Sequence, residues 1–167
     1  MELYILRHAI AVTRGTEGFP HDQDRPLTDK GRAKLGRVVR GMNALGLAFD
    51  LILTSPYLRA LQTAEVVATA MGAGKTLERT PQLAPDGDPR ALVRQLTSRR
   101  APSERILLVG HEPSLSALIS VLVSGDERAV ITLKKAGLCK LVVQTLRYGR
   151  CASLEWLLAP AQMERLR

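Results

Sequence analysis

Short apolar runs alternate with longer amphipathic stretches along this chain. Each run is too short for a helix and is bounded by charged or turn-forming residues, which is the pattern of a buried strand. The last part of the chain is rich in β-branched residues and short apolar runs, which favours strands that complete a sheet. Strands are expected over residues 2–6, 50–54 and 105–109, with a weak one near 76–78 and strand-like segments at 130–133, 138–146 and 151–158.

Helices are expected between these strands. Thr28 is a good N-cap, and apolar residues recur at helical spacing after it as far as Leu45. Ser55 and Pro56 read as the N-cap and first residue of a second helix, whose positive end would favour an anion. The helices are expected over 28–45, 55–71 and from 88 or 89 to about 99, with a fourth after the turn at 110–113.

Alternating strands and helices predict a single α/β domain. We expect three α/β/α layers, with helices on both faces of a mostly parallel central sheet. The length of 167 residues fits one domain, which we place at 1–160, followed by a frayed C-terminal tail at 161–167. Residues 9–27 read as a loop, and at this length it is either functional or disordered.

The composition excludes only a few classes of function. The chain has 24 Lys and Arg against 16 Asp and Glu, a net charge of +8, which suits nucleic acid, an acidic surface or a phosphorylated substrate. With two Phe, three Tyr and one Trp there is little stacking surface, so no nucleic-acid partner is expected. No apolar run approaches a membrane span and the start is no signal peptide, so we expect a cytoplasmic protein with no membrane partner.

Neither a metal site nor a cofactor is expected from the residue pattern. The two cysteines, Cys139 and Cys151, are too few for a disulfide framework or a metal site of their own, and we interpret them as small buried apolar groups. The sequence contains no Gly-rich phosphate loop and no cluster with metal-ligand spacing.

Polar residues follow three of the expected strands. Arg7 and His8 come after the first, Ser55 and Arg59 after the second, and His111 after the strand at 105–109. Ligand sites of open α/β sheets lie at the carboxyl ends of the strands, so these residues are expected to converge. Arginine matches phosphate oxygens in pairs, and neighbouring cations keep a histidine neutral and nucleophilic. The set therefore predicts a phosphoryl-transfer site, with the other histidine protonated to bind a phosphoryl oxygen.

Four motifs carry a resemblance to a known family. They are LYILRHA, TSPYLRALQTA, VGHEP and RPLTDKG. With them the chain resembles the histidine phosphatase superfamily, of phosphoglycerate mutase-like fold, over residues 2–145. The compact length and RPLTDKG are similar to the SixA-type phosphohistidine phosphatases of that superfamily.

The resemblance implies a role for each matching residue. His8 matches the phosphorylated nucleophile, Arg7 and Arg59 the phosphate clamp, and His111 the second histidine of the pocket. Ser55, in the Ser-Pro motif, is expected to help bind substrate.

Arg25 resembles a position at the substrate entrance, although it could equally anchor the loop through an ion pair. The chain departs from the family at Ala9, where glycine is usual; this costs little unless the residue needs a positive φ.

The general acid is the least defined part of the resemblance. Gln82 stands where related sequences often have glutamate, which leaves nearby Asp86 as one candidate. Glu112, directly after the second histidine, is another, although a carboxylate there also suits the N-terminus of a helix. Phosphohistidine has a better leaving group than an alkyl ester and depends less on an acid. A site without an assigned acid therefore fits phosphohistidine.

The expected activity is metal-independent phosphohistidine hydrolysis through a phosphorylated His8. The substrate would be a phosphohistidine-bearing protein or a small phosphorylated compound. The alternatives are a phosphatase of small phosphoesters or polyphosphate and a non-catalytic phosphate-binding module. Lys134 and Lys135 are either exposed charges at a strand end or part of the pocket rim, where they would meet an acidic substrate. The oligomeric state is left open.

Overall fold

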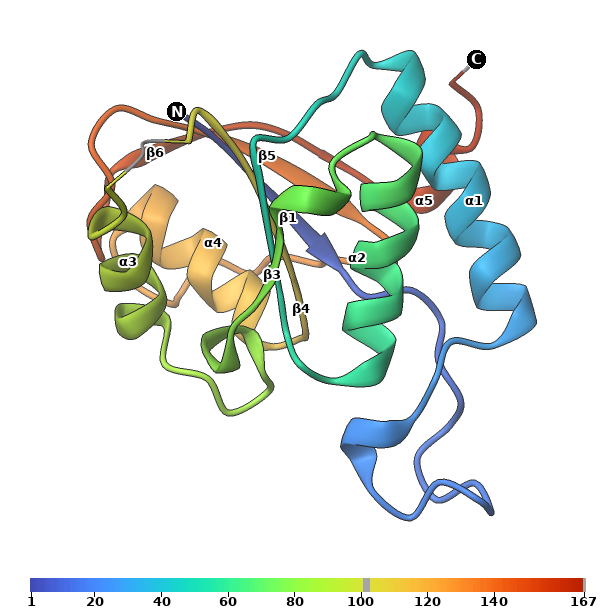
Figure 1. The fold of residues 1–167 in the computed structure, drawn as a ribbon. Coiled ribbons are helices and arrows are strands. Elements are labelled where there is room, and N and C mark those ends of the chain that lie inside the picture. The colour runs from blue at the N-terminus through green and yellow to red at the C-terminus, as the bar shows by residue number, and fades with distance from the viewer. Residues whose placement is uncertain (101–102, 167) are drawn as a thin grey trace.

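The computed structural model describes residues 1–100 and 103–166. A six-stranded sheet forms its centre in the order β3-β2-β4-β1-β5-β6 (Figure 1). The first four strands of this order are parallel, whereas β5 runs antiparallel to β1 and β6 antiparallel to β5. The predicted α/β class with a mostly parallel sheet is confirmed. The strands are β1 (Glu2–Arg7), β2 (Leu51–Thr54), β3 (Leu77–Arg79), β4 (Arg105–Gly110), β5 (Leu138–Val143) and β6 (Ala152–Leu158).

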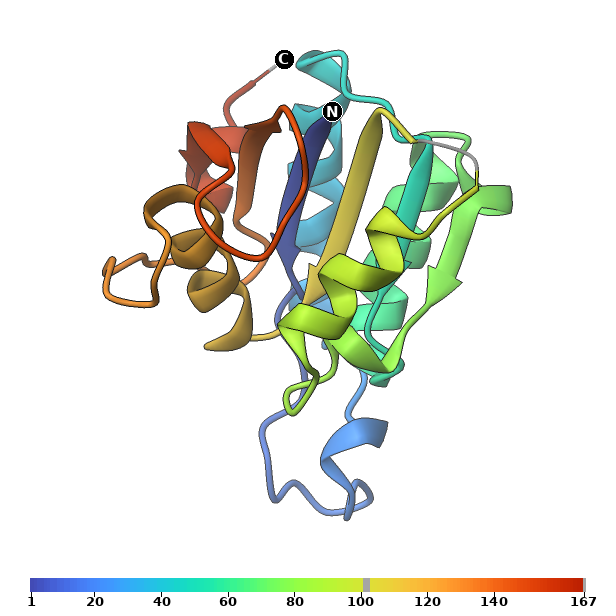
Figure 2. The same ribbon diagram turned by 90° about the vertical axis from the view of Figure 1, so that its left-hand side faces the viewer.

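Helices cover both faces of the sheet (Figures 1 and 2). Successive side chains of β1 point to opposite faces, so Tyr4 and Leu6 enter one core, while Leu3 and Ile5 enter the other. The first core is closed by α1 (Asp29–Ala44), α2 (Leu58–Ala70) and α5 (Pro160–Met163), and the second by α3 (Pro89–Thr97) and α4 (Ser114–Ser124). Short 3-10 helices lie at Asp22–Asp24 (η1), Gly74–Thr76 (η2) and Pro81–Leu83 (η3).

The caps of two helices form as predicted. The Thr28 hydroxyl accepts a hydrogen bond from the Gly31 amide at the start of α1, and the Asp88 carboxylate accepts one from the Arg90 amide in α3. Glycine at position 31 also lets the loop before α1 approach the helix. A Cβ there would lie 2.0 Å from the carbonyl oxygen of Ile10, so no larger residue fits without displacement.

Three predicted boundaries are wrong. The second helix begins at Leu58 rather than at Ser55–Pro56, because its first helical hydrogen bond runs from the Leu61 amide to the Tyr57 carbonyl. Residues 130–133 form no strand, since the described chain there turns back toward β1. The tail begins with an ordered helix, α5, because Met163 is fully buried in the core beside α1, where its backbone lies close to Gly41.

The two ends of the loop at 9–27 are joined by backbone hydrogen bonds, in a part that we call the neck, and its tip is exposed. At the neck the Val12 amide donates to the Pro26 carbonyl at 2.9 Å, and the Thr28 amide donates to the Ile10 carbonyl at 3.0 Å. Beyond the neck the segment projects from the body at the end of the sheet where β1 ends (Figures 1 and 2). None of the helices in the described part of the chain is long and apolar enough to cross a membrane.

Candidate active site

The site forms at the carboxyl ends of three neighbouring parallel strands. Hydrogen bonds of the sheet continue past the last strand residues: the His8 amide donates to the Gly110 carbonyl at 3.1 Å, and the Ser55 amide donates to Val109 at 3.0 Å. These bonds place His8, Ser55 and His111 side by side, with the two imidazole centroids 5.0 Å apart. The structure thus brings together the residues that follow the three strands.

His8 presents one ring nitrogen to the pocket. Its Nδ1 lies 2.7 Å from the Ala9 carbonyl oxygen, which only accepts, so Nδ1 carries the proton and Nε2 keeps its lone pair. Arg59 Nε donates to that Nε2 at 3.3 Å. Burial, together with the nearby charges of Arg59 and Arg7, lowers the pKa of His8 to about 3. The ring is therefore neutral near pH 7, as a nucleophile must be.

Alanine at position 9 is compatible with this arrangement. Ala9 is not among the described residues with a positive φ, and its amide donates to the Thr63 hydroxyl at 3.0 Å. The glycine that is usual here is therefore not needed for backbone conformation.

Ser55 holds the ring of His111 in place. The Ser55 hydroxyl accepts from the Tyr57 amide at 3.2 Å and lies 2.8 Å from His111 Nε2, in a hydrogen bond whose direction depends on the tautomer of the ring. The other ring nitrogen, Nδ1, is buried and has no partner among the described residues. Burial and the Arg59 charge lower the pKa of His111 to about 3. His111 is thus neutral near pH 7 without a bound anion, and its protonation as charge develops on a phosphoryl oxygen stays a prediction.

Asp22 from the loop tip contacts the arginine beside His8. Arg59 is almost fully buried; its Nη2 pairs with Asp22 Oδ2 at 3.0 Å, and its Nη1 donates to the Asp22 carbonyl at 2.7 Å. The other oxygen, Oδ1, pairs with Arg14 and Arg25. Partial burial would raise the pKa of Asp22, but the three arginines bring it well below its usual range. Asp22 is therefore ionised near neutral pH.

Sequence reasoning missed Asp22. It lies three residues before Arg25 in a long loop, and nothing local separates it from the other acids there. Its partner Arg59 is 37 residues away, so the pairing is a product of the fold. Arg25 makes the loop-anchoring ion pair with Asp22 and also donates to the Val12 carbonyl.

These groups surround a cavity of about 270 Å³ that is strongly cationic. Four arginines and one lysine line it, against two carboxylates: Arg7, Arg14, Arg25, Arg59 and Lys135, with Asp22 and Glu112. Arg7 donates through Nη1 to the Leu133 carbonyl, and its buried Nε has no partner among the described residues. Such a cavity suits a dianionic phosphoryl group.

The two candidate acids occupy different places. Glu112 lines the cavity, and its Oε1 accepts from the Ser116 amide at 3.2 Å, so it also serves the start of α4. Asp86 is exposed and does not line the cavity, whereas its neighbour Pro85 does. Gln82 accepts from the Asp88 amide within its own loop. In the described part of the chain, no three His, Cys, Asp or Glu side chains group as metal ligands would.

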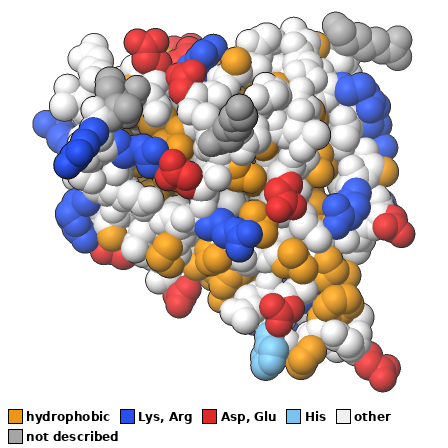
Figure 3. Space-filling view, in the orientation of Figure 1, with side chains coloured by type: hydrophobic (Ala, Val, Ile, Leu, Met, Phe, Trp, Pro, Cys, Tyr) orange, Lys and Arg blue, Asp and Glu red, His pale blue; other side chains and the backbone are white. Residues whose placement is uncertain are grey.

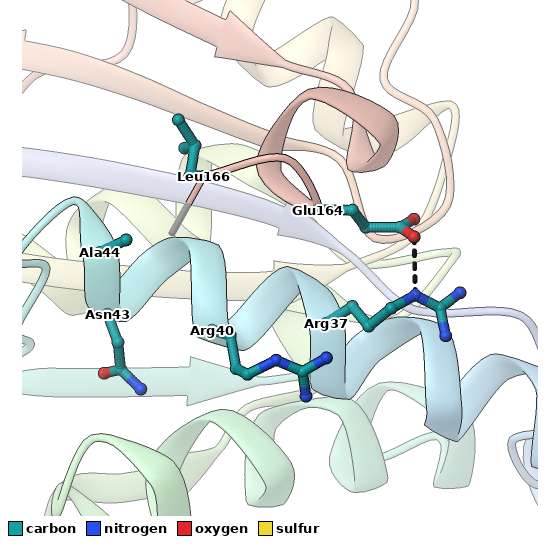
Figure 4. A pocket seen from close by; sticks show the side chains of 6 residues that line it. All are labelled: Arg37, Arg40, Asn43, Ala44, Glu164 and Leu166. Atoms are coloured by element: carbon teal, nitrogen blue, oxygen red, sulfur yellow. Dashed lines mark hydrogen bonds and ion pairs between the residues drawn. The ribbon is translucent and has the colours of Figure 1, made fainter.

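A larger cavity, of about 550 Å³, lies elsewhere. It is on the far part of α1, where Arg37 pairs with Glu164 at 2.8 Å, and Arg40 and Asn43 also line it (Figure 4). No histidine lines it, whereas both histidines that follow the strands line the smaller cavity.

Comparisons with known proteins agree with this geometry. The sequence model of the histidine phosphatase superfamily (branch 1) matches residues 3–84, which include His8 and Arg59. An uncharacterised protein of Picosynechococcus sp. is 41% identical over 146 residues, 84% of each chain. The phosphohistidine phosphatase SixA of Escherichia coli is 25% identical over 167 residues, 98% of this chain and 97% of SixA.

The chain belongs to the histidine phosphatase superfamily. It is a phosphatase, as the resemblance of its motifs implied. The fold is shared with solved structures of this superfamily. The protein histidine phosphatase SixA complexed with tungstate gives a TM-score of 0.75 at 24% identity, covering 96% of this chain and 98% of that one. A phosphoserine phosphatase mutant of Entamoeba histolytica, in complex with phosphoserine, gives 0.71 at 15% identity, covering 96% and 98%.

Proposed function

We propose that this phosphatase hydrolyses phosphohistidine through a covalent intermediate on His8. The observation that supports this most is the state of that ring: its Nδ1 proton is held by the Ala9 carbonyl, while Nε2 faces the cationic cavity. A neutral imidazole with one free nitrogen can attack phosphorus without a base to activate it.

In the first step, His8 Nε2 would form a bond to phosphorus as the bond to the substrate nitrogen breaks. A substrate imidazole that carries a proton on its other nitrogen leaves as neutral imidazole, so the enzyme need not supply a proton. Arg7, Arg59 and His111 Nδ1–H would hold the phosphoryl oxygens, where positioning and charge stabilisation provide most of the catalysis.

In the second step, water would attack phosphorus and release His8. As the N–P bond breaks, its electron pair returns to Nε2 as a lone pair, and the protons of the water leave with the phosphate. The proton on Nδ1 stays there, hydrogen-bonded to the Ala9 carbonyl, so the enzyme returns to its starting tautomer. An arriving dianion favours the charged form of the histidines around it. His111 would therefore gain basicity with phosphate bound and donate more strongly.

A phosphatase of small phosphoesters is the second candidate, and the position of Glu112 favours it. An alkoxide leaving group needs a proton, and Glu112 is a carboxyl group that lines the cavity without an ion pair among the described residues. A nucleic-acid function has less support. On the face shown in Figure 3, Lys and Arg side chains are dispersed among acidic ones and do not form a continuous stripe.

The test is phosphate release from a phosphohistidine peptide in the presence of EDTA. The intact protein should release phosphate and become labelled on His8 in an acid-labile, base-stable form. His8→Ala should show neither, whereas His21→Ala, which removes an exposed histidine of the loop tip, should behave as the intact protein. Release from small phosphoesters alone would favour the second candidate. Binding of phosphorylated compounds without any release would favour a non-catalytic module.

A further inference from the structure

A second cavity, of about 420 Å³, adjoins the catalytic one. The two cavities share Arg7 and Lys135 in their linings, so they form adjacent parts of one depression. We call the second one the basic groove. Lys34 of α1 and Lys134 complete its charged lining, and Ile10 and residues 159–161 supply an apolar floor.

The lysines of the basic groove are held next to His8 by the backbone. The Ala136 amide donates to the carbonyls of Arg7 and His8, at 3.0 and 3.2 Å, and the Arg7 amide donates to Gly137. Arg7 Nη1 in turn donates to the Leu133 carbonyl at 3.0 Å. The turn that carries Lys134 and Lys135 is therefore fastened to the end of β1. The relative position of these charges and the nucleophile is set by the fold.

The positive charge of this groove is largely uncompensated. No Asp or Glu lines it, and among the described residues Arg7, Lys134 and Lys135 have no carboxylate partner within 4.0 Å. Lys34 has a more distant carboxylate partner, since its Nζ lies 3.7 Å from Oε1 of Glu164. Partial burial, followed by the charges of Arg7, Arg25 and Arg59, lowers the pKa of Lys135, which lies between the groove and the catalytic cavity.

We propose that the basic groove binds an acidic polypeptide segment of the phosphorylated protein substrate, beside its phosphohistidine. This inference rests on the proposed function. Charge complementarity selects an anionic partner. The spread of the cations over three separate segments and the apolar floor favour a chain with alternating carboxylates and aliphatic stems over a compact second phosphate. Rim charges of this kind act mainly on encounter and affinity.

The test uses two phosphohistidine peptides of one sequence, with Asp and Glu flanking the phosphohistidine in the first and Asn and Gln in the second. For the intact protein we expect a KM about tenfold lower for the acidic peptide, with similar kcat. That advantage should shrink as the ionic strength rises, since exposed charges are screened. Equal KM values at low salt would overturn the proposal.

The double variant Lys34→Ala/Lys134→Ala tests whether the preference for the acidic peptide arises in the basic groove. It should raise the KM of the acidic peptide about tenfold, with turnover of a small aryl phosphate and KM of the neutral peptide unchanged. The matched control is Lys30→Ala/Arg32→Ala, which removes the same charge from exposed positions of α1 outside both cavities. An equal loss in the control would assign the effect to net charge and contradict a groove.

Failure of the proposed function would be visible separately, as no turnover of either peptide by the intact protein. In that case the unphosphorylated acidic peptide, labelled with a fluorophore, is titrated with the intact protein and with both double variants. Binding that Lys34→Ala/Lys134→Ala alone weakens supports the groove without reference to catalysis. Binding that does not distinguish the variants, or is absent, overturns it.

Discussion

The pocket has two halves that are held in different ways. The strand-end half consists of His8, Ser55 and His111, each at most 7% exposed. Hydrogen bonds that continue the sheet place His8 and Ser55, and His111 directly follows the last residue of β4. The loop half consists of Arg14, Asp22 and Arg25, which reach the pocket through side-chain ion pairs from a projecting segment. The side chain of Arg14 is 79% exposed. The strand-end half is held by the backbone of the sheet. The loop half depends on ion pairs that water and salt can weaken.

This difference assigns the halves different tasks. Phosphoryl transfer depends on atoms placed within a fraction of an ångström, and backbone ladders provide that placement. Admission of a substrate needs groups that can move, and a loop with an exposed tip provides them. Arg59 connects the halves, since it lies on α2, donates to His8 and pairs with Asp22.

Two of the three arginines that pair with Asp22 offer the sharpest test of this comparison. Arg59→Ala should lower kcat by about 10²–10³, because it removes a donor aimed at the reacting centre. Arg25→Ala loses an ion pair with the same carboxylate, but it should cost less than about tenfold and act mainly on KM. Steady-state kinetics on a phosphohistidine peptide measure both. Equal losses of kcat would mean that the loop half takes part in the chemical step.

The two candidate acids test whether a carboxyl group beside the strand-end half supplies the proton to the leaving group. Glu112→Gln should lower kcat on an alkyl phosphate by about 10²-fold and on phosphohistidine by much less, because only the alkoxide needs its proton. Asp86→Asn should change neither substrate appreciably, since Asp86 lies outside the cavity. Small and equal losses on both substrates for both variants would exclude both residues as the donor.

The halves also differ in how far the sequence predicts them. A strand that ends at Arg7-His8 or at Gly110 is visible in the hydrophobic pattern, and the rule for parallel sheets then brings the ends together. The pairing of Asp22 with Arg59 has no local signal, because it depends on where a long loop folds back.

The same limit explains two of the wrong element boundaries. Ser55 has the sequence of an N-cap, and its hydroxyl does accept from the Tyr57 amide, but it also contacts His111, and the helix itself starts at Leu58. The tail at 161–167 contains a fully buried apolar residue, Met163, whose burial depends on α1 being in place beside it. Tertiary contacts therefore override local preference at these positions.

A substitution at Gly31 tests how tightly the neck of the loop packs against α1. A Cβ at this position would lie 2.0 Å from the Ile10 carbonyl oxygen, so Gly31→Ala should lower the free energy of unfolding by about 1–3 kcal/mol. Gly36→Ala is the matched control on the same helix. It meets nothing within 4 Å and should raise stability by about 0.5–1 kcal/mol. Urea unfolding measures both, and an unchanged stability for Gly31→Ala would mean that the neck yields freely.

Asp22→Asn makes the smallest change to a side chain, and it tests the contact between Arg59 and the loop half. The amide keeps the shape of the side chain but removes the charge that orients Arg59, so kcat should fall by about tenfold. Removing a carboxylate from a site for a dianion also relieves repulsion, so KM should fall as well. A carboxylate that only anchors the loop would instead give a higher KM with kcat unchanged. Because its pKa lies well below the usual range, Asp22 stays ionised between pH 5 and 9, and this split should be the same throughout that interval.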